Sequence, residues 1–196
     1  MADGPVDEAE TVEIVVPVAD LAAQCDPFDG GEWDCDPIDP DEVLRAAAAG
    51  RFEREPWQVV NARHRGDRSF DDRAYHVGRA AFFLVNADLS PVELEIEVVP
   101  GGPRGARRVR MYAGNHRLAA AILRHDAEVR ARVPVEELDD ILDLLPGARA
   151  APCGPCGGSG RTDNHVTGEV ACPACDGSGV EMPDENAGMD AGGPTP

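Results

Sequence analysis

One motif, Cys-x-x-Cys-x-Gly-x-Gly, occurs twice near the end of the chain, at residues 153–160 and 172–179. A Cys-x-x-Cys turn can present two thiolates on one side of a metal ion, and zinc prefers a tetrahedron of such soft ligands. The glycines let the chain bend back with positive φ and bring backbone N–H groups near the sulfurs. The repeat therefore predicts one structural zinc ion, held by Cys153, Cys156, Cys172 and Cys175.

The identical spacing of the two pairs favours this metal site over redox-active dithiols or free thiols. All four ligand positions would come from the protein, so no coordination position is left open for catalysis. The segment has few apolar residues, and we expect it to be unfolded without the metal.

Both motifs resemble the cysteine-rich repeats of the DnaJ chaperone family. The resemblance covers only residues 153–179, and this chain has fewer repeats than the family normally has. The sequence also lacks a His-Pro-Asp triplet. The resemblance implies a metal-stabilised fold and a surface for a protein partner, but chaperone activity does not follow from it.

Charge is distributed very unevenly along the chain, whose formal net charge is −19. The first 44 residues contain 14 acidic residues and no basic residue, whereas residues 45–132 contain 16 of the 18 basic residues, all of them Arg. A net charge of this sign opposes general binding to nucleic acid or anionic membranes, but the basic middle could form a local anion site.

The chain has no run near the roughly 20 apolar residues that a membrane-spanning helix needs. Its acidic start lacks the basic and apolar regions of a signal peptide. We therefore expect a cytoplasmic protein without membrane contact. In a reducing cytosol, the 6 cysteines favour metal ligation over disulfides.

Hydrophobic periodicity predicts an α+β domain with a mixed sheet. Five β-rich or alternating segments are expected to be strands, at residues 13–18, 57–60, 92–98, 108–112 and 128–133. The arms 92–98 and 108–112 form a hairpin in which glutamates face arginines. Helices are expected at residues 40–49 with Asp39 as N-cap, and at 71–86, 116–126 and 135–145.

These elements divide the chain into four parts. Residues 11–148 are expected to form the α+β domain. The zinc module is expected over residues 149–180, of which 149–152 are a linker. We expect residues 1–10 and 181–196 to be disordered, because they combine acidic residues, Gly and Pro with very few apolar residues.

The segment 108–124 carries the second functional signal. A strand leads into Gly114, Asn115 could cap the following helix, and His116 and Arg117 fall in its first turn. Free N–H groups and the positive end of the helix dipole favour an anion there, and Arg117 could add a bidentate contact to phosphate.

This segment resembles the motif of the ParB/sulfiredoxin-like superfamily, and the order of elements over residues 13–145 is compatible with that fold. The matching residues are Gly114, Asn115, His116, Arg117, Ala119 and Ala120, followed by the strand at 128–133. The resemblance implies binding of nucleotide phosphate at this turn, with a nucleoside triphosphate and Mg²⁺ as ligands. If the protein is an enzyme, the resemblance implies a phosphotransferase or nuclease of the ParB-like type.

Three departures limit the resemblance. Ala113 stands where the family usually has Asp, which puts acid-dependent chemistry in doubt. The motif contains no Cys, so we do not expect sulfiredoxin activity. The chain beyond Leu145 is too short and too acidic for the helix-turn-helix of a chromosome-partitioning ParB protein.

The remaining candidate groups have simpler interpretations. Cys25 and Cys35 lie in an acidic loop whose spacing does not match a calcium-binding loop, so we expect a solvated loop. His64 and His76 lie in or near Arg-rich segments and are expected to be surface residues.

Two functions remain open from the sequence. The first is a ParB-like nucleotide- or phosphate-binding protein with a structural zinc module, acting on or near nucleic acid. The second is a non-enzymatic adaptor whose zinc hairpin docks a protein partner. Ala113 weakens the enzymatic interpretation, whereas the intact turn from Gly114 to Arg117 weakens the inert one.

Overall fold

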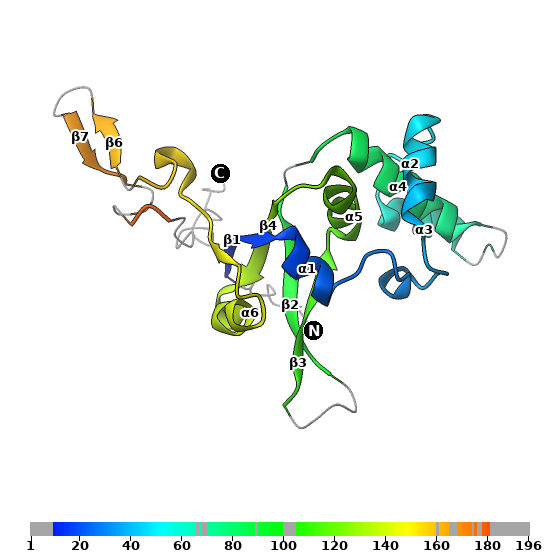
Figure 1. Cartoon of the computed structure of the whole chain (residues 1–196), viewed down its shortest axis with the longest axis horizontal. Coiled ribbons are helices and arrows are strands. Elements are labelled where there is room, and N and C mark those ends of the chain that lie inside the picture. Colours follow the sequence, from blue (N-terminus) through cyan, green and yellow to red (C-terminus); the bar gives the residue numbers. More distant parts are fainter. Residues whose placement is uncertain are drawn as a thin grey trace, which may run out of the picture.

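The structure is a computed structural model, which describes residues 10–65, 67, 70–88, 90–99, 105–159, 161–164, 168–173, 175 and 178–180. Its centre is a five-stranded mixed sheet in the order β3-β2-β4-β1-β5 (Figure 1). The strands are β1 Thr11–Pro17, β2 Val92–Val98, β3 Arg107–Ala113, β4 Glu128–Pro134 and β5 Arg149–Ala150. Among the described strand pairs of this sheet, only β2–β4 is parallel and the others are antiparallel. The expected α+β class with a mixed sheet is confirmed.

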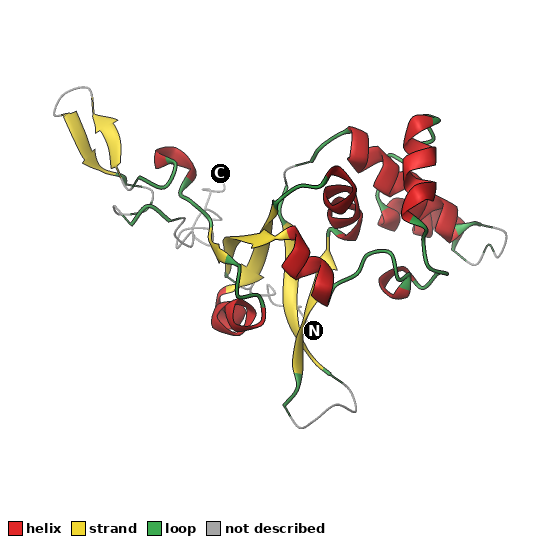
Figure 2. Ribbon diagram, viewed as in Figure 1, coloured by secondary structure: helices red, strands yellow, loops and turns green. Residues whose placement is uncertain are grey.

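Six α-helices are described in the part of the chain outside the metal module (Figure 2). They are α1 Val18–Gln24, α2 Pro40–Ala48, α3 Trp57–His64, α4 Asp72–Val85, α5 Asn115–Arg124 and α6 Leu138–Leu144. Helix α2 begins with the cap that the sequence predicts, since the Asp39 side chain accepts a hydrogen bond from the N–H of Asp41. Helix α4 also has an Asp cap, because the Asp71 side chain accepts from the N–H of Ala74.

The sheet buries one face, as the alternating strand sequences predict. Leu94 on β2 and Met111 on β3 are buried and opposite each other. Their intervening neighbours are charged and pair across the hairpin, with Glu97 to Arg108 at 2.7 Å and Glu95 to Arg110 at 3.4 Å. Such exposed ion pairs contribute about 0–1 kcal/mol each, so they specify the register more than they stabilise the sheet.

Helix α5 is shared by two apolar cores. Leu118 and Ala121 belong to the core over the sheet, together with Leu21 of α1 and Ile141 of α6. Ala119, on another side of the same helix, belongs to the core formed with α2 and α4. The small side chains at this part of α5 let α4 and the sheet both approach the helix closely, which joins the helical layer to the sheet.

Two local expectations are wrong. Residues 57–60, which we expected to form a strand, lie in helix α3. The preference of these residue types for strands depends on packing in a sheet. Here they pack as a helix instead, with Val60 buried and the Trp57 ring 5.0 Å from the Tyr75 ring of α4. Val18, assigned by the sequence to the first strand, instead begins α1 directly after Pro17.

Beyond the domain, residues 149 and 150, which we expected in a linker, form β5 against Val15 and Ile14 of β1. The metal module follows, with the short 3-10 turn Gly154–Cys156 and an antiparallel hairpin of β6 Arg161–Asn164 and β7 Gly168–Ala171. In Figure 1 this hairpin projects from the end of the molecule opposite to α2 and α3.

The segments expected to be disordered fall almost wholly outside the described residues, which begin at Glu10 and end at Val180. Among the described helices, none combines the length and the apolar character needed to cross a membrane.

Candidate functional site

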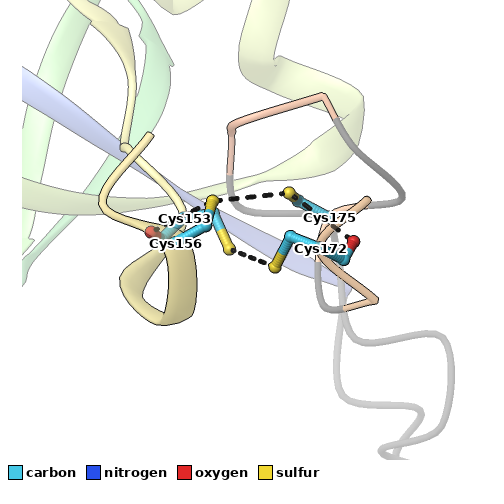
Figure 3. Close-up of side chains that lie close together, drawn as sticks. All are labelled: Cys153, Cys156, Cys172 and Cys175. Atoms are coloured by element: carbon cyan, nitrogen blue, oxygen red, sulfur yellow. Dashed lines mark hydrogen bonds between the residues drawn. The ribbon is translucent and has the colours of Figure 1, made fainter. Parts of the chain in front are cut away.

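The four cysteines of the repeated motif converge on one point (Figure 3). The two pairs of sulfurs face each other across the cluster, with Cys153 Sγ 3.9 Å from Cys172 Sγ and Cys156 Sγ 3.8 Å from Cys175 Sγ. All four sulfurs lie within 4.8 Å of one another, and none is in a disulfide. This cluster could hold a metal ion.

Backbone geometry explains why two distant segments form one cluster. After the first pair the chain turns back through Gly157 and Gly158, with φ of 58° and 87°. The two motifs are then joined, since the N–H of Cys153 donates to the carbonyl oxygen of Gly179 at 2.9 Å. The N–H of Gly179 also lies 3.3 Å from Cys175 Sγ, as expected for an amide that stabilises a thiolate.

Burial decides the chemistry of this cluster. Cys153, Cys172 and Cys175 are at most 1% exposed. Burial raises the pKa of the Cys153 thiol, because a buried thiolate without a cation is unfavourable. A bound metal ion supplies that cation, so metal binding and deprotonation of these thiols would occur together.

The second candidate site lies where β3 passes into α5. Gly114 has φ of 111°, a conformation that favours glycine, and a Cβ there would lie 2.6 Å from a methyl carbon of Val92. Its carbonyl oxygen accepts the N–H groups of Arg117 and Leu118 and so begins the helix.

The expected cap by Asn115 is wrong. Gly114 is the N-cap, Asn115 is the first residue of the helix, and no side chain caps α5. Because Asn115 lies inside the helix, its side chain is free to point elsewhere, and its Oδ1 is buried with no hydrogen-bond partner. In the first turn, the N–H groups of Asn115 and His116 also have no hydrogen-bond partner among the described residues.

Arg117 lies in the first turn, as the sequence predicts. Its guanidinium donates to the carbonyl oxygen of Ser90 at 3.0 Å, a contact that fixes the side chain beside the start of α5. Burial lowers the pKa of Arg117, but an arginine remains charged at neutral pH. A second cation, Arg79 of α4, lines the same pocket and lies over the Phe83 ring at 4.5 Å.

The pocket at the start of α5 has a volume of about 390 Å³. It is lined by residues from η1 (Gly31–Trp33), α3, α4, β3 and α5. Both tryptophans and both tyrosines of the chain line it: Trp33, Trp57, Tyr75 and Tyr112. The sequence contains few aromatic residues, so this concentration marks the pocket as a place where a flat ligand ring could stack.

Two histidines, one of which the sequence did not indicate, meet in this pocket. His76 Nδ1 lies 2.9 Å from His116 Nε2, and the Trp33 ring is stacked on both imidazoles. His76 was expected at the surface but is only 2% exposed, so that expectation is wrong. His76 is buried because it lies on the face of α4 that packs against α3 and α5. The arginines near it along the chain did not indicate this burial.

Acid should destabilise the fold through His76. Burial lowers the pKa of His76 to about 4, against 6.5 for an unperturbed histidine. The unfolded chain therefore takes up a proton first as the pH falls, and stability is lost between about pH 6.5 and 4, by up to about 3 kcal/mol. Urea unfolding followed by tryptophan fluorescence measures this loss, because both tryptophans lie in the α+β domain.

The matched variant is His76→Phe, which keeps a ring but cannot take up a proton. It should lose clearly less stability between pH 6.5 and 4.5, although His116, whose pKa is also lowered by burial, still contributes. Equal losses in the variant and the parent protein would show that His76 does not titrate in this way.

A larger hollow of about 780 Å³ lies along α2 and α4. One of the arginines that line it, Arg73, is paired with Glu42 and donates to the carbonyl oxygen of Pro37. The loop with Cys25 and Cys35 forms no metal cluster among the described residues, and Cys25 Sγ donates to the carbonyl oxygen of Val109.

Comparison with known proteins identifies no relative: no protein-family model, curated protein or solved structure matches this chain.

Proposed function

We propose that the protein binds a nucleotide or a related phosphate ester in the pocket at the start of α5. One observation carries the proposal: the first turn of a ten-residue helix, two arginines and four large aromatic rings line the same pocket. The residues proposed to bind the phosphate are Gly114, Asn115, His116 and Arg117. Their resemblance to the ParB/sulfiredoxin-like motif supports the same assignment.

The phosphate end of the ligand would meet three kinds of positive group. The N–H groups of Asn115 and His116, the first two of α5, have no partner within the helix, and the helix dipole adds partial positive charge there. Arg117 and Arg79 supply full charges from two different helices. These local charges matter more for an anionic ligand than the overall charge of −19, because salt screens distant charges beyond about 10 Å.

The aromatic residues that line the pocket suit a nucleobase. Tyr112 is 71% exposed, so its ring is accessible to a base, and the half-buried Trp57 lines the same pocket. Stacking of a base on an aromatic side chain contributes about 1–3 kcal/mol. The volume of about 390 Å³ is within the range of small-ligand sites and too small for a long polymer segment.

A thermal shift assay tests the proposal. With ATP and Mg²⁺ at about 100 times the dissociation constant, binding should stabilise the fold by about 2.7 kcal/mol and raise Tm by about 5–10 °C. Arg117→Ala should weaken binding by roughly 10- to 100-fold, since hydrogen bonds to charged groups are worth about 1.5–3 kcal/mol. Arg107→Ala, which removes an arginine paired with Asp140 outside this pocket, should leave the shift unchanged.

The result that contradicts the proposal is the absence of a shift with ATP, GTP, CTP or UTP, each with Mg²⁺. An equal loss of binding in Arg107→Ala would show that the interaction depends on general charge and not on this pocket.

We further propose that the cysteine cluster holds a structural zinc ion in a DnaJ-type module. With Zn–S bonds of about 2.3 Å, the edge of a regular tetrahedron of sulfurs is about 3.8 Å. The contacts of 3.9 Å and 3.8 Å between facing sulfurs agree with that edge. Zinc would supply a closed, four-thiolate centre that holds the two motifs together, with no open position for a substrate.

A further inference from the structure

The histidine pair at the pocket shares one hydrogen bond, and its surroundings determine which ring donates. The His76 ring contacts both tryptophans, with centroid distances of 4.8 Å to Trp33 and 5.0 Å to Trp57. Tyr75 meets the same ring edge-on at 5.1 Å. The one ring nitrogen of His76 that does not face His116, Nε2, is buried and has no hydrogen-bond partner in the described structure.

A neutral histidine carries its single proton on one of the two ring nitrogens. If His76 carried it on Nε2, a buried N–H would lack an acceptor, and such orphaned donors are rarer in proteins than unpaired acceptors. If His76 carries it on Nδ1, that N–H donates to His116 Nε2 and only a lone pair remains unpaired. The second arrangement leaves no buried donor without a partner.

This arrangement fixes the proton of the second ring. His116 Nε2 accepts from His76, so the proton of His116 must be on Nδ1. His116 lines the pocket, and no partner for its Nδ1 is found among the described residues. The Oδ1 of the adjacent Asn115 is also unpartnered; as an acceptor, it would pair with a donor group of a ligand and not with an oxyanion.

We propose that His76 is a positioning residue that locks His116 in the Nδ1–H form, so that an uncharged His116 donates this proton as a hydrogen bond to a ligand oxyanion. The ligand part of this inference rests on the proposed function, with phosphate as the oxyanion. The tautomer part rests only on the contacts of the two rings. A neutral donor completes the phosphate site without placing a third cation beside Arg79 and Arg117.

Long-range ¹H–¹⁵N NMR of the full-length protein, labelled at histidine, tests the tautomers directly. At pH 7 both His76 and His116 should show a protonated Nδ1 and an unprotonated Nε2. His64, which is partly exposed and lies outside this histidine pair, provides the internal reference signal. A protonated Nε2 on His76, or a doubly protonated ring on either residue, would overturn the inference.

Two variants test the role of His76. His76→Phe keeps the ring volume but removes the donor, so His116 should lose its fixed Nδ1–H form and affinity for ATP with Mg²⁺ should fall about tenfold. In His76→Asn, the side-chain amide nitrogen can replace Nδ1, so His116 should keep its tautomer. This second variant also covers the case in which His76→Phe does not fold.

Addition of inorganic phosphate, or of ATP with Mg²⁺, tests the ligand role. The Nδ1 proton of His116 should move downfield and exchange more slowly with water. If the tautomers are as expected but this proton does not respond to a ligand that the thermal shift shows to bind, the donor role is overturned while the nucleotide site stands. If no ligand binds, the proposed function fails and the tautomer result remains as a separate finding.

Discussion

Replacing Cys172 by Ser should release the metal and unfold the module over residues 153–180 while the α+β domain remains folded. Structural zinc contributes about 10–16 kcal/mol to the folding of zinc-finger peptides, far more than this module can gain from apolar packing. Among the described residues of the module, the buried apolar cluster consists only of its cysteines. With one thiolate missing, the remaining contacts should not hold the two motifs together.

Three measurements check this result. Elemental analysis of the untagged native protein should find one equivalent of zinc in the parent chain and less than about a tenth of an equivalent in Cys172→Ser. Hydrogen exchange should become fast in residues 153–180, while Tm followed by tryptophan fluorescence changes by less than about 2 °C. Cys35→Ser is the matched control, because Cys35 lies outside the cluster and should keep the metal.

Two outcomes would contradict the metal assignment. One is a native protein without a stoichiometric transition metal. The other is slow exchange in residues 153–180 of Cys172→Ser, which would show that the module folds without a complete ligand set.

Gly114→Ala should destabilise the domain by about 3–5 kcal/mol and abolish ligand binding at α5. Two costs combine: a non-glycine residue is strained at φ of 111°, and the added Cβ would lie 2.6 Å from Val92 Cγ1 and 3.0 Å from Val92 Cα. Val92 is 1% exposed on a central strand, so it cannot move aside without disturbing the sheet core. Urea unfolding followed by tryptophan fluorescence measures the loss.

Gly50→Ala separates the two costs. Gly50 also has positive φ, at 66°, but nothing lies within 4 Å of its added Cβ. Backbone strain alone should cost about 1–2 kcal/mol there. If the two substitutions lower the free energy of unfolding by the same amount, the close approach of Gly114 to Val92 is not a reason for glycine at this turn.

Local sequence patterns predicted the parts of the fold that depend on neighbours in the chain. The hairpin is an example, because alternation in β2 and β3 defines both the buried face and the pairing of Glu97 with Arg108. The cysteine cluster is another, since its ligands lie in two copies of one short motif. Helix α3 could not be predicted in this way, because its conformation depends on packing of Trp57 against α4.

The pocket shows the same division. Gly114, His116 and Arg117 are consecutive or nearly so, and their position at the start of a helix could be predicted from the sequence. Trp33 and His76 come from segments far from that motif, and only the tertiary fold brings them to His116. The sequence did contain one indication of the pocket. The chain has only 2 Trp and 2 Tyr residues, so each of them was a candidate for a binding site.

Strand β5 has a consequence for how the chain can be divided. It consists of Arg149 and Ala150, yet it covers part of the outer edge of β1, and Ala151 beside it is buried and donates its N–H to Glu13. A truncation before Arg149 would leave a long strand with unpaired amides, a surface on which separate molecules associate and aggregate. A truncation directly before Cys153 keeps β5 and Ala151 in place, so we expect it to separate the α+β domain from the cysteine cluster without exposing this edge.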